Sequence, residues 1–380
     1  MRKIVLAFDS FKGSVSALEI SSELTQTIRE EWPDCEVCSF PIADGGEGTV
    51  QAIERSLPVV KYCCSVHGPL MEKVDASYVV TEDGTVILEM ASANGLPLVP
   101  EGLRNPMETT TLGTGELIVD AINRGCRKFV VGLGGSATND AGIGVMHALG
   151  VRFFDKAGRE LEPKGKNLEY IVHVDQSRLH PDLSSCQFVL ACDVTNPFYG
   201  PDGAAFVFAP QKGANTQQVE ALDKGLRSYA TCLKKEIGCD VACIPGAGAA
   251  GGMGGGLLAF LNAELKSGID IILDLMGFDE ALSGTDVVLT GEGKIDAQTG
   301  MGKALSGVLT RARLVGVPVV GIGGSVEDIN QLNQLGFTAL FSMQSAPVSL
   351  EQAMRKEIAL QNLSNTVKQV LRLLSVGLRP

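Results

Sequence analysis

Strand–helix alternation at both ends of the chain, with a different pattern between them, constrains the fold more than any other feature. In the first 60 residues, apolar runs at Lys3–Phe8 and Glu36–Phe40 alternate with helical patterns at Val15–Trp32 and Glu47–Leu57. A strand that leads through a helix into another strand predicts parallel pairing with right-handed crossovers. The alternation returns near the C-terminus, where we expect strands at 287–290, 319–322 and 339–341 and helices at 303–315, 326–335 and 350–374.

The middle of the chain has another pattern. Short β runs between Val59 and Leu88 are separated by turn signals around Gly68-Pro69 and Asp83-Gly84, which predicts an antiparallel segment. Beyond it we expect strands at 129–133 and 188–191 and helices at 114–124, 139–149 and 217–237.

Together these patterns predict an α/β fold with two α/β domains. One is a Rossmann-like parallel-sheet domain formed by both chain ends, residues 1–60 and 285–380, and the other is an inserted mixed α/β domain, residues 61–284. We expect the active site in the cleft between them. Two domains also suit a length of 380 residues, which exceeds the size at which one hydrophobic core usually stops growing. A simple tandem of two domains is the alternative.

Charge and hydropathy restrict the partners. The net charge of −12 argues against a nucleic-acid surface, which needs clustered Lys and Arg. No apolar run reaches the roughly 18–20 residues that span a bilayer, and the apolar run near the N-terminus is too short for a signal peptide. We therefore expect a cytoplasmic protein that binds neither nucleic acid nor membrane. The oligomeric state stays open, a homodimer included.

The 45 glycines cluster in short loops that follow predicted strands. In an open α/β sheet, ligands bind outside the carboxyl ends of the strands. A phosphate must approach backbone N–H groups closely, and glycine lacks the Cβ that would obstruct it, while a following helix directs its positive end at the anion. Gly134-Gly135-Ser136 before the expected helix at 139–149 is one example. Tight turns would explain any single loop, but so many loops indicate a phosphate-bearing ligand.

Two known phosphate-binding motifs fit poorly. Gly300–Lys303 lacks the first glycine and the following Ser or Thr of a Walker A motif, which disfavours a P-loop kinase. Gly246–Gly251 formally matches the dinucleotide fingerprint, and Val241–Ile244 could be its strand. Pro245, however, interrupts the join between strand and turn. An NAD-dependent dehydrogenase of a small hydroxy-acid stays an alternative, as does a non-catalytic ligand-binding protein.

Acidic and basic residues in the strand-end loops indicate phosphoryl transfer. This chemistry needs Mg²⁺ ligands and a residue that orients or deprotonates the attacking hydroxyl. Aspartates in such loops also make turns or helix caps, so each alone is weak evidence. The candidates at or just beyond strand ends are Asp9, Asp44, Asp193 and Asp296, with Lys12 and Lys294 beside glycines.

Taken together, five motifs resemble the bacterial glycerate kinase family, which includes glycerate 2-kinases. They are Phe8–Ser14, Ala43–Gly48, Gly134–Gly142, Asp193–Pro197 and Thr290–Asp296, and they occur in the family's order along essentially the whole chain. The resemblance implies phosphorylation of D-glycerate, most simply to 2-phospho-D-glycerate, with ATP and Mg²⁺, in a two-domain α/β protein.

The chemistry of this reaction suggests roles for the motif residues. We expect ATP phosphates against the loops 132–136 and 290–293. Asp193, Asp296 and Lys12 form the expected catalytic set: Asp193 holds Mg²⁺ or orients the glycerate hydroxyl, Asp296 is its rival as the base, and Lys12 neutralises the phosphoryl group or the carboxylate. Expected substrate contacts are Ser10, Asp44, Asn139 and Asp140, and expected nucleotide contacts are Gly134, Gly135, Ser136, Gly291, Glu292, Gly293 and Lys294.

Overall fold

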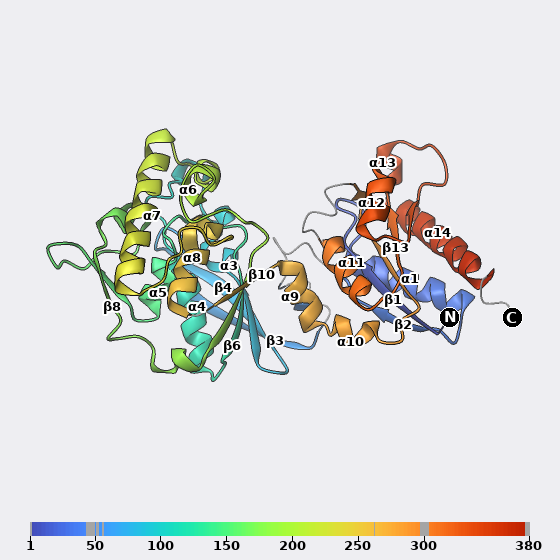
Figure 1. Ribbon diagram of the computed structural model, residues 1–380, viewed down its shortest axis with the longest axis horizontal. Coiled ribbons are helices and arrows are strands. Elements are labelled where there is room, and N and C mark those ends of the chain that lie inside the picture. The colour runs from blue at the N-terminus through green and yellow to red at the C-terminus, as the bar shows by residue number, and fades with distance from the viewer. Residues whose placement is uncertain are drawn as a thin grey trace. The chain divides into compact units, whose positions relative to one another are not determined.

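The computed structural model describes residues 2–42, 50, 53–54, 57–261, 263–296 and 304–376. The chain divides into two compact units: the terminal unit, residues 1–44 and 269–380, and the middle unit, residues 45–268 (Figure 1). The chain thus returns to the terminal unit at Ile269, whereas the sequence placed this boundary at 285. The reason is that apolar residues of α9 (Gly268–Leu275) and α10 (Phe278–Leu282) belong to the core of the terminal unit.

A five-stranded parallel sheet forms the centre of the terminal unit, as predicted. Its order is β15 (Ala339–Ser342), β13 (Val319–Gly323), β11 (Val287–Gly291), β1 (Lys3–Phe8) and β2 (Glu36–Ser39). The chain runs from β1 outward to β2 and then crosses to β11 on the other side of β1. Ligands of doubly wound sheets bind at the carboxyl ends of the strands at such a reversal of strand order.

Helices cover both faces of this sheet (Figure 1). Ile4, Leu6 and Phe8 pack with apolar residues of α1 (Ala17–Glu31) and α14 (Lys356–Val376). The alternate residues of β1 pack instead with α9, α10 and α11 (Ala304–Leu314). Burial of both faces explains why β1 is a continuous apolar run. The remaining elements of this unit are β12 (Lys294–Ile295), β14 (Ser325–Val326), α12 (Ile329–Leu335) and α13 (Leu350–Ala353).

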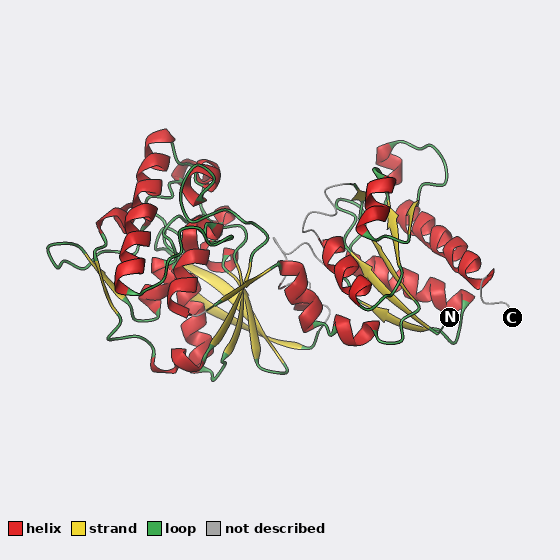
Figure 2. Ribbon diagram, in the orientation of Figure 1, coloured by secondary structure: helices red, strands yellow, loops and turns green. Residues whose placement is uncertain are grey.

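The middle unit contains a six-stranded mixed sheet (Figure 2). Its order is β10 (Glu264–Lys266), β9 (Gln187–Ala191), β6 (Lys128–Gly132), β5 (Thr85–Glu89), β4 (Lys73–Thr81) and β3 (Val59–His67). The first three of these strands in the chain, β3, β4 and β5, pair antiparallel as predicted, and β5, β6, β9 and β10 pair parallel. The carboxyl ends of β6 and β9 are therefore neighbours.

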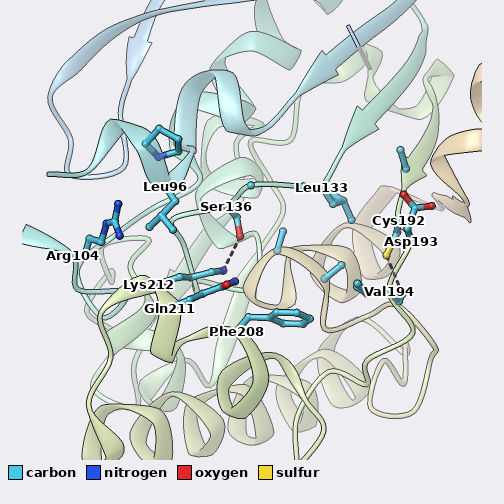
Figure 3. A pocket seen from close by; sticks show the side chains of 16 residues that line it. Leu96, Arg104, Leu133, Ser136, Cys192, Asp193, Val194, Phe208, Gln211 and Lys212 are labelled. Atoms are coloured by element: carbon cyan, nitrogen blue, oxygen red, sulfur yellow. Dashed lines mark hydrogen bonds between the residues drawn. The ribbon is translucent and has the colours of Figure 1, made fainter. Parts of the chain in front are cut away.

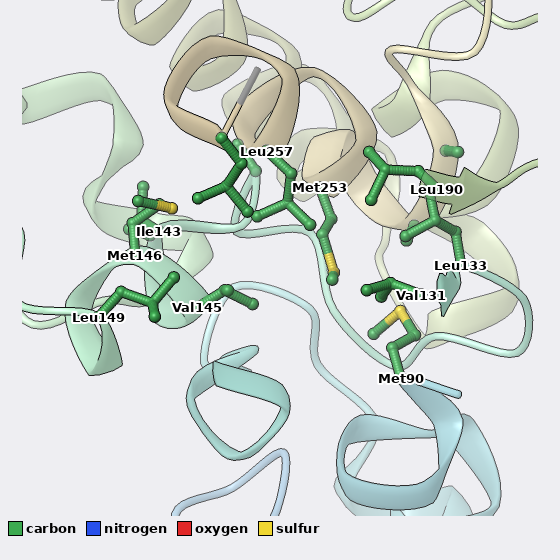
Figure 4. Packing of buried hydrophobic residues seen from close by; sticks show 14 of the residues in the cluster. Met90, Val131, Leu133, Ile143, Val145, Met146, Leu149, Leu190, Met253 and Leu257 are labelled. Atoms are coloured by element: carbon green, nitrogen blue, oxygen red, sulfur yellow. The ribbon is translucent and has the colours of Figure 1, made fainter. Parts of the chain in front are cut away.

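Helices and short turns of 3₁₀ helix complete the middle unit. Figure 4 shows apolar side chains of α5 and α8 packing in the same cluster as Val131, Leu133 and Leu190, which come from β6, the residue after it, and β9. The helices are α3 (Ala91–Asn94), α4 (Leu112–Asn123), α5 (Ile143–Ala148), α6 (Ala204–Phe208), α7 (Thr216–Glu236) and α8 (Ala249–Leu261), and a short antiparallel pair is formed by β7 (Arg152–Phe154) and β8 (His173–Asp175). Among the described helices, none is long and apolar enough to cross a membrane.

Several expected elements differ from the structure. The helix expected from residue 139 begins only at Ile143, because Ala141 and Gly142 have left-handed backbones with φ of 53° and 75°. The expected helix at 326–335 begins at Ile329, and the long C-terminal helix is divided into α13 and α14. Most of the helix expected at 47–57 lies outside the described residues.

The glycine run after Pro245 packs against a neighbouring loop. Residues 242 and 243 lie in a turn and 241–244 contain no strand, so the strand that Val241–Ile244 could have formed before the fingerprint is absent from this described segment. A Cβ on Gly251 would lie 2.2 Å from the carbonyl oxygen of Thr138, and one on Gly256 would lie 1.9 Å from that of Ala141. Glycines are therefore needed for α8 to approach residues 138–141, and the dinucleotide fingerprint lacks its strand.

Candidate active site

A cavity of about 460 Å³ lies in the middle unit, at the carboxyl ends of β6 and β9 (Figure 3). It brings together Gly134, Gly135 and Ser136 after β6 with Asp193 after β9, four of the residues that the sequence singled out. Backbone hydrogen bonds fix the first loop, since Leu96 N donates to Gly135 O at 2.8 Å. Gly135 has a left-handed backbone with φ of 70°, which glycine adopts without strain.

Asp193 sits at the edge of this cavity, directly after β9. Its carboxylate accepts a hydrogen bond from the backbone N–H of Gly268 at 2.8 Å. This bond ties the loop after β9 to the chain that leaves β10, the neighbouring parallel strand. The carboxylate is thus held at the carboxyl ends of the strands, a position where a metal-bound phosphate or a substrate hydroxyl could reach it.

Lys212 is a buried cation in the wall of the same cavity, and the sequence did not indicate it. Its side chain is buried, and its Nζ donates to Ser136 Oγ at 2.7 Å (Figure 3). The same Nζ also donates to Thr138 O at 2.6 Å. Burial lowers the pKa of Lys212 to about 7, and the negative charge of Asp140 opposes this change. Nothing in the local sequence distinguishes this lysine from a solvated one, because its burial depends on packing against loop 136–138.

Asp140 is fully buried beside the cavity and organises the loop before α5. Its carboxylate accepts hydrogen bonds from Thr111 N and Thr111 Oγ1, both at 2.8 Å, and from the backbone N–H groups of Gly142 and Gly144. Burial raises the pKa of the Asp140 carboxyl, and these hydrogen bonds oppose the rise. The first N–H groups of α5 therefore bind this carboxylate, so they are not the phosphate cradle that we expected from the sequence.

Asn139 is also fully buried, and neither it nor Asp140 lines the cavity. Among the described residues, no hydrogen-bond partner is found for the side-chain nitrogen or oxygen of Asn139. Direct contact of Asn139 or Asp140 with substrate stays a prediction.

A second cavity, of about 800 Å³, lies in the terminal unit at the carboxyl ends of β1, β11 and β13. This is the point where the strand order reverses between β1 and β11. One part of its lining is polar and the other is apolar, with Met343, Val348 and Leu350 among the apolar residues. The predicted residues that line it are Ser10, Lys12, Glu292, Gly293, Lys294 and Asp296, together with Asp9.

In this second cavity Lys294, an expected nucleotide contact, forms ion pairs with two carboxylates. Lys294 Nζ lies 3.0 Å from Glu327 Oε2 and 3.4 Å from Asp296 Oδ2, and these carboxylates raise the pKa of the lysine.

Gly291 is buried at the end of β11, where a Cβ would lie 2.0 Å from Ile322 O, so sheet packing alone requires a glycine there. Nucleotide contact by Gly291 stays a prediction, and Asp44 lies outside the described residues.

The carboxylates of both cavities suit a metal that arrives with a nucleotide. Within the described residues, no group of three or more His, Cys, Asp or Glu forms a metal cage. Mg²⁺ bound together with phosphates needs only one or two protein carboxylates. Asp193 offers one in the middle unit, and Asp9, Glu292 and Asp296 offer them in the terminal unit.

Comparison with known proteins gives one consistent result. The model of the glycerate kinase family matches residues 4–375. A glycerate kinase of Bacillus cereus is 44% identical over 370 residues, which cover 97% of this chain and 97% of that protein. The glycerate 2-kinase of Escherichia coli is 43% identical, with 99% of both chains covered. A crystal structure of a protein assigned as glycerate kinase 2 from Salmonella typhimurium is similar with a TM-score of 0.86 and 42% identity, again over 99% of both chains.

Proposed function

Since the chain belongs to the glycerate kinase family, we propose that it converts D-glycerate and ATP into 2-phospho-D-glycerate and ADP. It is a glycerate kinase, an enzyme that transfers a phosphoryl group from ATP to glycerate. The observation that carries this conclusion is the similarity to a glycerate 2-kinase, 43% identical over 379 residues. The name of that relative also supports the 2-hydroxyl as the acceptor.

The two alternatives have no support. The dinucleotide fingerprint at Gly246–Gly251 does not follow a strand. Packing explains its last two glycines, because a Cβ on Gly248 would lie 2.3 Å from Pro197 O and one on Gly251 would lie 2.2 Å from Thr138 O. A dehydrogenase therefore loses the one motif that favoured it. A non-catalytic binding protein is disfavoured because the named relatives above are kinases.

We propose that the glycine-rich loops of the two cavities bind the substrates. The loop Gly134–Ser136 and the loop Glu292–Lys294 both follow parallel strands, the place where α/β sheets bind ligands. ATP phosphates would lie against these loops, and Ser10 would contact glycerate. Lys12 would neutralise the transferring phosphoryl group or the glycerate carboxylate. Catalysis would come mainly from positioning and charge stabilisation.

The proposed metal site involves Asp193. Bound Mg²⁺ supplies positive charge that offsets the charge of the ATP phosphates. Asp193 would hold the ion or orient the glycerate hydroxyl, and Asp296 is the rival for the second task. Asp193 belongs to the middle unit and Asp296 to the terminal unit, so the proposal assigns roles to residues of both units.

The proposal also covers the location and the assembly of the protein. A cytoplasmic location fits an ATP-dependent enzyme of small-molecule metabolism. The net charge of −12 gives no basis for a nucleic-acid partner. A homodimer stays a prediction, which light scattering of the purified chain would test.

A coupled assay of ADP release tests the function directly. We expect ADP release to need both D-glycerate and Mg²⁺, and ³¹P and ¹H NMR of the product to show the phosphate on the 2-hydroxyl. A product with phosphate on the 3-hydroxyl would change the proposed regiochemistry but would still show that the protein is a glycerate kinase. Absence of glycerate-dependent ADP release across a panel of hydroxy-acids would refute the proposed function.

A further inference from the structure

Lys212 is an unusual residue because its charge is buried without a carboxylate partner. Only 2% of the residue is exposed, and its two hydrogen-bond acceptors, Ser136 Oγ and Thr138 O, are both neutral. Within the described part of the chain, no carboxylate lies within ion-pair distance of its Nζ, and the negative charge of Asp140 acts on it only from beyond contact. Burying a cation in this way is strongly unfavourable unless a compensating charge is bound nearby. A structural role alone would be served better by an apolar side chain.

The geometry leaves Lys212 able to bind a ligand. A lysine ammonium has three N–H donors, and the described residues accept two of them. The residue lines the cavity that also contains Gly134, Gly135 and Ser136. The third N–H of the Lys212 ammonium is therefore left for a ligand, and because Lys212 lines the cavity, a substrate bound there can supply the acceptor.

A second cation lies in the same wall. Arg104 lines the cavity, and its Nε is buried without a hydrogen-bond partner among the described residues. The two cations come from segments in close contact, because a Cβ on Gly213 would lie 2.3 Å from Arg104 O. Gly213, which follows Lys212, has a left-handed backbone with φ of 94° that glycine permits.

We propose that Lys212 and Arg104 together bind an oxyanion group of a substrate, a carboxylate of glycerate or a phosphate of ATP. This inference rests on the proposed function. The bound anion would accept the remaining Lys212 donor and the Arg104 Nε–H in charge-assisted hydrogen bonds, which are stronger than those between neutral groups. It would also supply the negative charge that the buried ammonium lacks. In a chain with a net charge of −12, such a local pair of cations allows an anionic substrate to bind.

Binding and kinetics of Lys212→Met in the full-length chain test the proposal. Calorimetric titration with ATP alone and with D-glycerate alone, and the KM of each, would separate the two sources of the oxyanion. We expect one substrate to bind about 10- to 100-fold more weakly, the range for loss of a charged hydrogen bond, and the other to bind almost as in the wild type. Weaker ATP binding identifies a phosphate site, and weaker glycerate binding identifies a carboxylate site.

Two further variants make the test decisive. Lys224→Met is the matched control, because Lys224 is exposed on α7 and pairs with Glu169, and it should leave both affinities unchanged. Arg104→Gln should weaken the same substrate as Lys212→Met, and it decides the question alone if Lys212→Met fails to fold. Wild-type affinity for both substrates in either folded variant, or weakening of different substrates by the two, would overturn the proposal. The wild-type assay of ADP release separates this outcome from failure of the proposed function.

Discussion

Asp193 and Asp296 are the two residues proposed to orient or deprotonate the glycerate hydroxyl. Asp193 lines the cavity of the middle unit, and Asp296 lines that of the terminal unit. The Asp→Asn change keeps the size of each side chain but removes its charge and its ability to accept a proton. We expect the residue that acts as base to lose about 10²- to 10⁴-fold in kcat as the Asn variant.

Steady-state kinetics of Asp193→Asn and Asp296→Asn would measure this loss, with circular dichroism to show that each variant is folded. Asp34→Asn is a suitable control, since Asp34 is exposed in the turn before β2. Turnover like that of the wild type in either test variant would remove that aspartate from the catalytic set.

The buried ammonium of Lys212 also predicts a pH dependence of stability. Its pKa is lowered from 10.5 to about 7, so between these values the unfolded chain binds more protons at this site than the folded chain. The contribution of Lys212 to the free energy of unfolding therefore rises with pH in this window, by up to about 1.4 kcal/mol per pH unit. The charged group that acts on Lys212 is Asp140, and Arg104 and Asp193 line the same cavity; all three are unchanged in Lys212→Met.

Urea denaturation of the wild type and of Lys212→Met at pH 7, 8 and 9 would measure this contribution. We expect the free energy of unfolding of the wild type, minus that of the variant, to increase as the pH rises. Parallel pH profiles for the two proteins would show that Lys212 has an ordinary pKa. Because the comparison is a difference between two proteins, titration of all shared groups cancels to first order.

At the scale of elements, the glycine run that leads into α8 serves close packing. The glycine run that begins with the fingerprint at Gly246–Gly251 continues through α8, where a Cβ on Gly256 would lie 1.9 Å from Ala141 O. We expect Gly256→Ala to lower the free energy of unfolding by about 1–3 kcal/mol, the usual effect of overpacking. Gly102→Ala is the matched control, because a Cβ there would meet nothing within 4 Å. Equal stability of the two variants in urea denaturation would contradict the close packing.

Element boundaries were predictable where local signals are strong. The helix α1 begins beside Ser16, whose side chain forms a capping box with Glu19, and β1 was predicted with its observed bounds because both of its faces are buried. The start of α5 was missed because Asp140 binds the N–H groups of Gly142 and Gly144, a contact that depends on Thr111 and the folded loop. Local sequence patterns cannot predict such a contact, because its partners are about 30 residues apart in the chain.

At the scale of the whole molecule, the candidate site could be predicted only in part. Residues of the loops after β1, β6, β9 and β11, which the sequence singled out as ligand contacts, line the two cavities, because strand ends with glycine and polar residues can be recognised along the chain. Lys212 was missed since its role arises from contact between segments about 75 residues apart, the separation between Lys212 and Ser136 or Thr138. The sequence thus indicated which loops line the cavities, whereas the buried Lys212 was found only in the structure.

The division of candidate residues between two units leads to a prediction for the whole chain. Phosphoryl transfer requires both substrates within bonding distance, and catalytic candidates occur in each unit. If candidate residues of both units contact the substrates, ATP, Mg²⁺ and glycerate together should slow amide hydrogen exchange in loops of both units. The expected segments are 9–14 and 292–296 in the terminal unit and 133–136 and 192–194 in the middle unit.

Hydrogen exchange followed by mass spectrometry would resolve these segments in peptides from a single digest. ADP with 2-phosphoglycerate, or ATP with a glycerate analogue that lacks the acceptor hydroxyl, would keep the complex from turning over. Residues 217–236 on α7 line neither cavity and provide an internal control for global stabilisation. Protection confined to one unit, with all ligands present, would mean that this unit alone binds both substrates. Because the aspartates tested above belong to different units, that result would also decide between them, leaving as base only the one in the protected unit.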